Sequence, residues 1–285
     1  MAIVEKRGFF SGRTLLIIFM TALGLFQMLP LIFMVSHAFK PLDELFLFPP
    51  RFFVRNPTLD NFADLLVATS GTDVPFSRYL FNSLWVSVIV VVGSVIVSSL
   101  CAYPLAKHHR MPGRDFLFNV IVSALMFPGA VTTIPGYLVI NGLGLIDTYW
   151  ALILPALAGP MNMFLMRQFM TQIPDSLIDA AKVDGASEWS TFMKVVVPFA
   201  KPAWATVTIF AFMGVWNDSW SPVVYLRTEA MKTLPVAIQT IQGGGIGRAG
   251  AAAAASLLMT APVIIVFLIL QSQVLSTMAY SGIKA

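Results

Sequence analysis

The chain has 285 residues, of which 57% are hydrophobic and 11% are charged, and its net charge is +4. A soluble domain carries about 45–50% apolar and about 25% charged residues. The charges here are too few to cover a water-exposed surface, so a soluble globular enzyme is excluded, and the hydrophobicity excludes a disordered chain. The single cysteine, Cys101, excludes an intrachain disulfide and a metal site built from cysteines. Lys and Arg are scattered, which argues against nucleic acid as a partner and fits the cytoplasmic loops of a membrane protein.

The first apolar stretch covers residues 14–39 and follows the basic residues Lys6, Arg7 and Arg13. A secretory signal also begins with basic residues, but its apolar core is about 7–15 residues long and ends at a small-residue cleavage site. This stretch is longer and no such site follows it, so we expect a retained transmembrane helix. A polar segment broken by prolines comes next, over residues 40–78.

Five further apolar stretches approach the length of about 20 residues that crosses a bilayer as a helix. They cover residues 79–106, 116–140, 149–166, 202–224 and 251–274. The sequence therefore predicts an all-α integral membrane protein with six transmembrane helices. The predicted organisation is an N-terminal span with an external loop (1–78), a transmembrane domain of five spans (79–275) and a cytoplasmic tail (276–285).

The distribution of basic residues predicts the orientation of these spans. The short loop 107–114 contains Lys107, Arg110 and Arg114, whereas the loop 141–148 contains no Lys or Arg. Cytoplasmic loops carry the excess of Lys and Arg. We therefore expect both termini and the long polar segment between the fourth and fifth spans to lie in the cytoplasm.

That polar segment, residues 168–201, predicts a helix–turn–helix outside the lipid. Pro174 and Asp175 suit the start of a helix, because proline fits a first position and an acid complements the helix dipole. Gly185 can end this helix in a left-handed conformation. Ser187 can cap the helix that follows.

Within this segment, a motif resembles the EAA loop of type I ABC importer permeases. It consists of Asp179-Ala180-Ala181, Asp184-Gly185-Ala186 and, further on, Pro198. In that family the loop docks in a groove of the ATPase subunit and transmits its opening and closing. The resemblance implies that these seven residues couple the chain to a partner ATPase, which uses ATP and Mg, and that this chain has no cofactor of its own. Asp179 stands where the family usually has Glu, so the charge is kept on a side chain one methylene shorter.

Other motifs are similar to those of the family's carbohydrate-uptake branch, the maltose-type inner-membrane permeases. They are Pro57 to Phe62, Phe81 to Leu84, Ala102 to Lys107, Trp216 to Asp218, Thr233 to Gln239 and Gly282 to Lys284. The resemblance implies a permease subunit that forms half of the translocation pathway of an ATP-driven, binding-protein-dependent sugar importer in a bacterial-type inner membrane. The partners it implies are a second homologous permease, an ATPase dimer, an extracytoplasmic solute-binding protein and membrane lipid.

No motif predicts a catalytic site. The sequence contains no G-x-x-x-x-G-K-[ST], so the chain is not itself the ATPase. A G-x-G-x-x-G pattern does occur at Gly245 to Gly250, but an apolar helix follows it in place of the acid that a dinucleotide site needs. We interpret it as a flexible external loop, and the resemblance implies that it reaches towards the sugar-binding protein. The three histidines lack neighbours suited to a metal, so no metal site is expected.

Polar residues inside spans are costly and often mark a transport pathway. Asp218 is the main candidate, together with Trp216 and Asn217, because an aromatic face packs on a sugar ring and an acid binds hydroxyls. Asn82 and Asn162 are weaker candidates. Alternatively, Asp218 is an interfacial residue within an aromatic belt.

Other functions stay open at this point. A permease of the same superfamily could carry glycerol phosphate or a peptide, although no Lys or Arg lies deep in a span, which favours a neutral sugar. A proton-coupled secondary transporter could use Asp218 as its proton carrier, and would be expected to show internal repeats. A membrane enzyme would need a cluster of acids or histidines at one membrane face, and none occurs.

Overall fold

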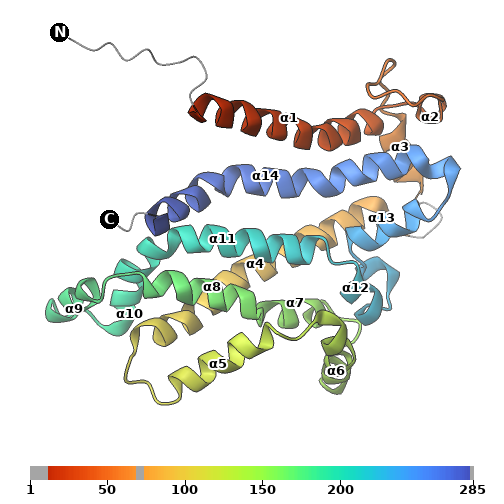
Figure 1. Ribbon diagram of the computed structural model, residues 1–285. Helices are drawn as coiled ribbons and strands as arrows, with labels where there is room; N and C mark the ends of the chain where they lie inside the picture. Colours follow the sequence, from red (N-terminus) through yellow and green to blue (C-terminus); the bar gives the residue numbers. More distant parts are fainter. Residues whose placement is uncertain (1–11, 69–73, 283–285) are drawn as a thin grey trace, which may run out of the picture. The chain divides into compact units, whose positions relative to one another are not determined.

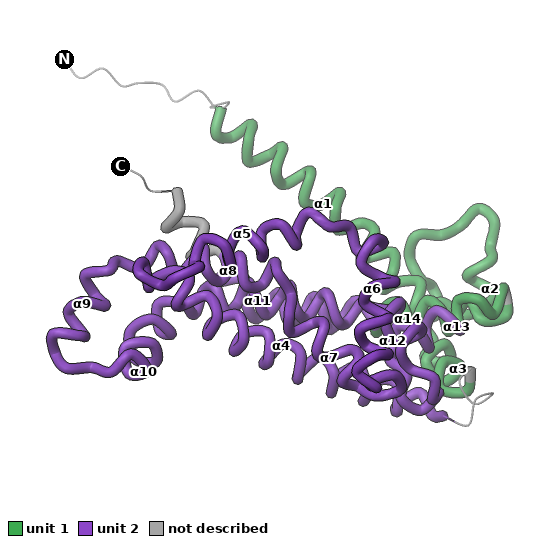
Figure 2. Tube along the Cα trace, turned by 90° about the horizontal axis from the view of Figure 1, so that it is seen from below, with its two compact units in different colours: residues 1–68, 241–258 green, residues 69–240, 259–285 purple. Residues whose placement is uncertain are grey.

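The computed structural model describes residues 12–68 and 74–282, and this part of the chain is helical without a β-strand. The predicted all-α fold is confirmed. The chain forms two compact units, residues 1–68 with 241–258 and residues 69–240 with 259–285 (Figure 2). Helices α13 (Leu234–Gln242) and α14 (Ala249–Gly282) contribute to both units.

The first unit contains α1 (Gly12–Ala38), α2 (Leu42–Leu45), α3 (Asp60–Ala68) and the beginning of α14. Helix α1 reaches a mean hydropathy of 2.3 over its most apolar stretch, none of which is buried within the chain. A helix that is apolar on all sides is typical of a membrane span, and its bounds agree with those predicted from the sequence.

One buried amide connects three parts of the first unit. The Asn61 Nδ2 atom donates to the carbonyl oxygens of Ala38 and Lys40, at 2.9 and 2.6 Å. Helix α14 passes so close that a Cβ on Gly250 would lie 2.1 Å from Asn61 Oδ1. Glycine at position 250 therefore allows the start of α14 to pack against α3 and the end of α1.

The second unit is built on α4 (Phe76–Lys107), a helix of 32 residues that lies against α7, α8 and α11 (Figure 1). Besides its parts of α13 and α14, the unit contains, in chain order, α5 (Arg114–Ala124), α6 (Gly129–Gly142), α7 (Trp150–Leu157), α8 (Pro160–Thr171), α9 (Asp175–Val183), α10 (Glu188–Thr191), a π-helical turn (Phe192–Val196), α11 (Val197–Trp216), α12 (Trp220–Tyr225) and a 3₁₀ turn (Glu229–Met231). Helices α9 and α10 lie at one end of α4, and α6 and α12 lie near the other (Figures 1 and 2).

Small residues at helical spacing form the buried face of α4. They are Ser87, Ser94, Ser98, Ala102 and Ala106. Small side chains allow helix backbones to approach closely inside a membrane protein. On α4, a Cβ at Gly93 would lie 2.5 Å from the Leu157 Cδ2 atom of α7. The composition of α4 thus explains why it is the central helix of the unit.

The span predicted over residues 116–140 is not one continuous helix. Helix α5 ends at Ala124, α6 begins at Gly129, and the two are bent by 110° at the break between them. Pro128 precedes α6 with an extended backbone, φ −61° and ψ 142°. Proline has no N–H to continue a helix and restricts the residue before it, so the helix is interrupted there.

Two further predicted spans have different bounds. Residues 149–166 divide at Ala158 and Gly159 into α7 and α8. The helix predicted over 202–224 begins earlier, at Glu188, runs through the π-helical turn, and ends at Trp216. In the described part of the chain, four helices are long and apolar enough to cross a membrane, or five if α5 and α6 form one broken span. The count of six spans stays a prediction.

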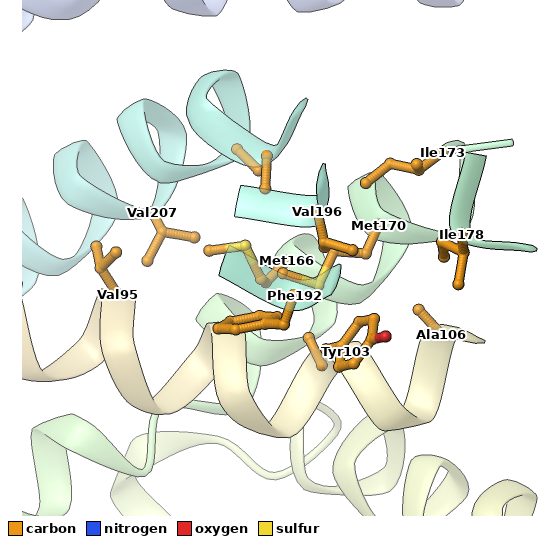
Figure 3. Packing of buried hydrophobic residues seen from close by; sticks show 13 residues of the cluster. Val95, Tyr103, Ala106, Met166, Met170, Ile173, Ile178, Phe192, Val196 and Val207 are labelled. Carbon is orange, nitrogen blue, oxygen red and sulfur yellow. The ribbon is translucent and has the colours of Figure 1, made fainter. Parts of the chain in front are cut away.

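The main hydrophobic core of the second unit lies at the end that carries α9 and α10. Figure 3 shows side chains from several helices meeting there, among them Tyr103 of α4, Met166 and Met170 of α8, Ile178 of α9, Phe192 of the π-helical turn and Val207 of α11. Each of these side chains is at least nine-tenths buried. Helix α9 is therefore anchored in the core of the membrane helices through Ile178.

Candidate functional site

The segment of the predicted coupling loop, residues 168–201, folds into a helix–turn–helix as expected. Gly185 follows α9 with φ 80°, in the left-handed region. The N–H of Ala186 donates to Ala181 O at 2.9 Å, and the N–H of Gly185 donates to Lys182 O at 3.0 Å. This pair of bonds is a Schellman motif, which satisfies the last carbonyls of a helix. Ser187 then caps α10 by accepting the N–H of Ser190 at 3.2 Å.

A π-helical turn joins α10 to α11 close to Pro198. The N–H of Val197 donates to the carbonyl oxygen of Phe192, five residues earlier. Pro198 cannot donate to the carbonyl of Lys194 as a regular α-helix would require. The wider turn before Pro198 accommodates this missing donor, so the helix continues from α10 into α11 without a break.

Lys107, at the end of α4, fixes the coupling loop to the membrane helices. Its Nζ atom donates to Asp175 Oδ1 at 2.7 Å and to Thr171 O at 3.4 Å, and it also donates to Ile173 O. The Lys107 side chain is 4% exposed, whereas that of Asp175 is 55% exposed. Two hydrogen bonds hold the pKa of Asp175 below its ordinary value. The one from Lys107 has the larger effect and the one from His109 the smaller. Asp175 is therefore ionised and paired at neutral pH.

Glu188, the first residue of α10, makes the second connection. Its carboxylate accepts the hydroxyl of Tyr103 at 2.9 Å and pairs with Lys182 Nζ at 2.7 Å. His108 Nε2 lies 3.4 Å from the same carboxylate. Both helices of the coupling loop are thus attached to α4, α9 through Asp175 and α10 through Glu188.

Much of the surface of the coupling loop is exposed. Of the predicted coupling residues, Asp179, Ala180, Asp184, Gly185 and Pro198 are exposed, and Ala181 and Ala186 are half-buried. Several large apolar side chains of the loop are also exposed, most of all Val183 at 87% and Trp189 at 62%. Exposed large apolar side chains are enriched where a protein contacts a partner. The geometry is thus suited to docking a partner.

A cavity of about 240 Å³ lies within the second unit, between α4, α7, α8, α11 and α12. It brings together two of the five predicted pathway residues, Asn162 of α8 and Asp218, which follows α11. The Asp218 Oδ1 atom accepts the N–H groups of Trp220 and Ser221, at 2.9 and 3.0 Å. Asp218 therefore caps α12 and lies outside any helix, contrary to its predicted place inside a span.

The other three predicted pathway residues do not line this cavity. Trp216 is 1% exposed, and its Nε1 atom donates to Met259 O of α14 at 2.9 Å. The Asn217 amide donates to Met213 O at 2.9 Å. Asn82 is 1% exposed, and both its amide nitrogen and its amide oxygen make hydrogen bonds within the chain.

Residues 226–234, which we call the anchored segment, are fixed to the end of α4 opposite the coupling loop. The Asn82 Nδ2 atom donates to the carbonyl oxygens of Ala230 and Lys232, at 2.8 and 2.9 Å, and its Oδ1 atom accepts the Tyr149 hydroxyl at 2.8 Å. The Ser83 Oγ atom accepts the Leu234 N–H at 2.7 Å. Asn82 thus acts as a structural anchor.

Asp147 adds a further attachment to the anchored segment. Its Oδ1 atom accepts the N–H groups of Arg227 and Thr228 at 2.9 and 2.8 Å, and its Oδ2 atom accepts the Thr228 hydroxyl at 2.6 Å. The hydroxyl and N–H of Thr228 hold the pKa of Asp147 below its ordinary value.

Two residues of the cavity, Ser83 and Thr233, were not predicted as pathway residues. Thr233 is 5% exposed and its Oγ1 atom has no hydrogen-bond partner in the structure. Both residues belong to sequence motifs that marked the carbohydrate branch. The sequence offered no signal that places Thr233 at a cavity, because it lies in a segment between spans and reaches α4 through contacts about 150 residues apart in sequence.

The family of binding-protein-dependent transport system inner membrane components matches residues 3–279. The chain belongs to this family. It is a permease subunit of an ABC importer, a transport component rather than an enzyme, and a protein of the inner membrane.

Relatives with named transport systems cover nearly the whole permease. The arabinooligosaccharides transport system permease protein AraQ of Halalkalibacterium halodurans is 31% identical over 90% of this chain and 90% of its own. The sulfoquinovosyl glycerol transport system permease protein SmoH of Agrobacterium fabrum is 30% identical over 97% of this chain and 95% of its own. A chain from the crystal structure of a bacterial ABC transporter for the acidic polysaccharide alginate aligns with a TM-score of 0.78 and 26% identity, over 93% of this chain and 99% of that one.

Proposed function

We propose that this permease imports a sugar or oligosaccharide. In this proposal it forms half of a translocation pathway, together with a second homologous permease, two ATPase copies and an extracytoplasmic binding protein. The coupling loop is the observation that carries the proposal. Much of its surface is exposed, and two residues of α4 hold it in place: Lys107 bonds Asp175, and Tyr103 bonds Glu188. The named cargo of the relatives AraQ and SmoH, and of the alginate importer, supports carbohydrate as the substrate class.

The mechanism follows from these attachments. ATP and Mg bind to the partner ATPase, which supplies the energy by hydrolysis. When the two ATPase copies close, they move the exposed side of α9, where Asp179, Val183 and Asp184 lie. Ile178 and Asp175 of α9 pass this motion to α4 and α8, and the helices change from inward- to outward-facing as packed bodies, since cores do not deform continuously.

We also propose that both termini and the coupling loop lie in the cytoplasm and that the chain crosses the membrane six times. The basic residues of the α4–α5 loop, Lys107, Arg110 and Arg114, support this orientation. Six crossings result if the broken pairs α5–α6 and α7–α8 each cross once. Broken helices of this kind are tolerated in a membrane where protein covers the free backbone groups.

The test is uptake into proteoliposomes that contain the complete importer, with its binding protein outside and ATP inside. A labelled arabinooligosaccharide and a labelled galactooligosaccharide serve as probes. We expect accumulation of at least one of them that requires ATP and persists when an uncoupler collapses the proton gradient. Uptake that vanishes with the gradient while ATP remains high would establish a proton-coupled transporter and refute the proposal. Uptake of glycerol phosphate or a peptide in place of both sugars would refute the carbohydrate assignment.

A further inference from the structure

The cavity beside Asp218 combines a small volume with a distinctive set of polar groups. Its polar lining consists of Ser83 on α4, Asn162 on α8, Asp218 after α11 and Thr233 before α13, and the rest of the lining is apolar apart from one glycine. Asp218 is the only charged residue among those that line it, and no Lys, Arg or His is among them. A site of this kind, with apolar walls and a few convergent polar groups, is typical of small-molecule binding.

Several of these polar groups are left unused by the chain. The Thr233 Oγ1 atom is buried without a hydrogen-bond partner. Asn162 is 8% exposed, and its amide makes no side-chain hydrogen bond with the described residues. The bonds from Trp220 and Ser221 both end on Asp218 Oδ1, which leaves Oδ2 available. A buried polar group normally has a partner, so the Thr233 hydroxyl points to a ligand that supplies one, and Asn162 and the Oδ2 atom of Asp218 lie at the same cavity with free hydrogen-bonding capacity.

The chemistry of the lining restricts that ligand. A carboxylate accepts hydrogen bonds, an amide both donates and accepts, and a hydroxyl does either. A sugar ring carries several hydroxyls that match all three groups. The cavity, of about 240 Å³, has room for a sugar ring.

We propose that this cavity binds one uncharged sugar unit of the cargo and that Asp218 excludes acidic sugars. This inference rests on the proposed function. A uronate or sulfonate group in the cavity would lie near the Asp218 carboxylate without a cation to offset the repulsion, and like charges placed together suppress a wrong partner. The cargo class is therefore a neutral oligosaccharide.

The test uses the complete importer in proteoliposomes and two labelled probes, galactotriose and its acidic counterpart trigalacturonate. Wild-type importer is expected to take up the neutral probe in preference, by about a hundredfold. Asp218→Asn is expected to lower galactotriose uptake by about ten- to a hundredfold and to reduce the preference. Asp147→Asn is the matched control, because that carboxylate also accepts backbone N–H groups but lies outside the cavity; it is expected to leave the preference unchanged.

Thr233→Val provides a second variant that keeps the shape of the side chain. Its hydroxyl makes no hydrogen bond with the residues that the structure describes, so thermal stability should hold or rise while the KM for the neutral probe increases several-fold. Normal uptake by both Asp218→Asn and Thr233→Val, or equal uptake of the two probes by wild type, would overturn the inference and leave the proposed function intact. ATP-dependent uptake of neither probe, nor of any other sugar, would instead refute the proposed function and the inference with it.

Discussion

Gly185 shows how one residue type determines the shape of the coupling loop. Its φ of 80° lies in the region that residues with a Cβ adopt at a cost of about 1–2 kcal/mol. No heavy atom lies within 4 Å of the position that a Cβ would occupy. Backbone strain, and not crowding inside this chain, is therefore what a substitution would introduce, together with a side chain on the exposed surface.

We predict that Gly185→Ala lowers the stability of the permease by about 1 kcal/mol but retains part of the substrate-stimulated ATP hydrolysis. Gly185→Trp should leave the protein inserted but abolish that hydrolysis, because the indole would lie between the loop and the ATPase. Thermal unfolding and ATPase assays of the reconstituted importer measure the two effects. Gly142→Ala, at a position with equal space and no positive φ, is the control. Normal stimulation in Gly185→Trp would contradict the docking role.

Asp147 gives a pH-dependent prediction at the same scale. Because the pKa of its carboxyl is lowered in the folded chain, its contribution to stability is present above the ordinary aspartate pKa of about 3.9 and is lost as the pH falls through the lower folded pKa. Asp147→Asn should therefore lower the melting temperature at neutral pH, and the difference from wild type should disappear towards pH 3. A difference that stays constant from pH 7 to pH 3 would show that the charge of Asp147 does not matter.

Among the elements, α4 is the helix to which both the coupling loop and the anchored segment are attached. Lys107 is buried and bonds three acceptors of the coupling loop, whereas Lys182 is 44% exposed and pairs with Glu188 alone. Exposed ion pairs contribute about 0–1 kcal/mol, while hydrogen bonds to a buried charge contribute about 1.5–3 kcal/mol. The two lysines therefore differ in what their removal costs.

We predict that Lys107→Met reduces the amount of sugar transported per ATP hydrolysed, and lowers stability by about 1.5–3 kcal/mol, because two backbone carbonyls and Asp175 lose their donor. Lys182→Met should change either quantity only slightly. Parallel measurements of uptake and hydrolysis in proteoliposomes give the ratio. Equal effects of the two substitutions would show that burial of Lys107 has no role in coupling.

The sequence was informative where a structure depends on neighbouring residues. The start of α9, the left-handed turn at Gly185 and the cap at Ser187 all follow from contacts within five residues, and all are confirmed. Hydropathy did not find the breaks at Pro128 and Gly159, because an average over about 20 residues is insensitive to a single proline or glycine.

The candidate cavity was less accessible from sequence because its residues come from distant parts of the chain. Asn162 and Asp218 were selected as polar residues near apolar stretches, and the fold brings them together. Asn82 was selected on the same ground, yet the structure gives it backbone partners about 150 residues away. Polarity alone cannot distinguish an anchor from a ligand-binding residue. A polar side chain inside the protein needs hydrogen-bond partners in both cases, whether the chain or a ligand supplies them.

For the whole molecule, the proposed orientation is the property most directly tested. We predict that a cysteine at Ser187, in a Cys101→Ser background, is labelled by an impermeant reagent only in inverted vesicles. A cysteine at Leu143, which is 63% exposed in the loop after α6, should be labelled in intact cells. Labelling of the Ser187 position in intact cells would reverse the proposed topology.

Helix α4 also fixes a length. Its 32 residues span about 48 Å at about 1.5 Å per residue, and nearly every backbone group along it is bonded to another in the same helix, so it resists stretching. Asn82 and Ser83, near the beginning of α4, hold the anchored segment, and Lys107, at the end of α4, holds the coupling loop. A displacement applied at one end must therefore arrive at the other with nearly its full size. The coupling loop and the anchored segment are therefore expected to move together.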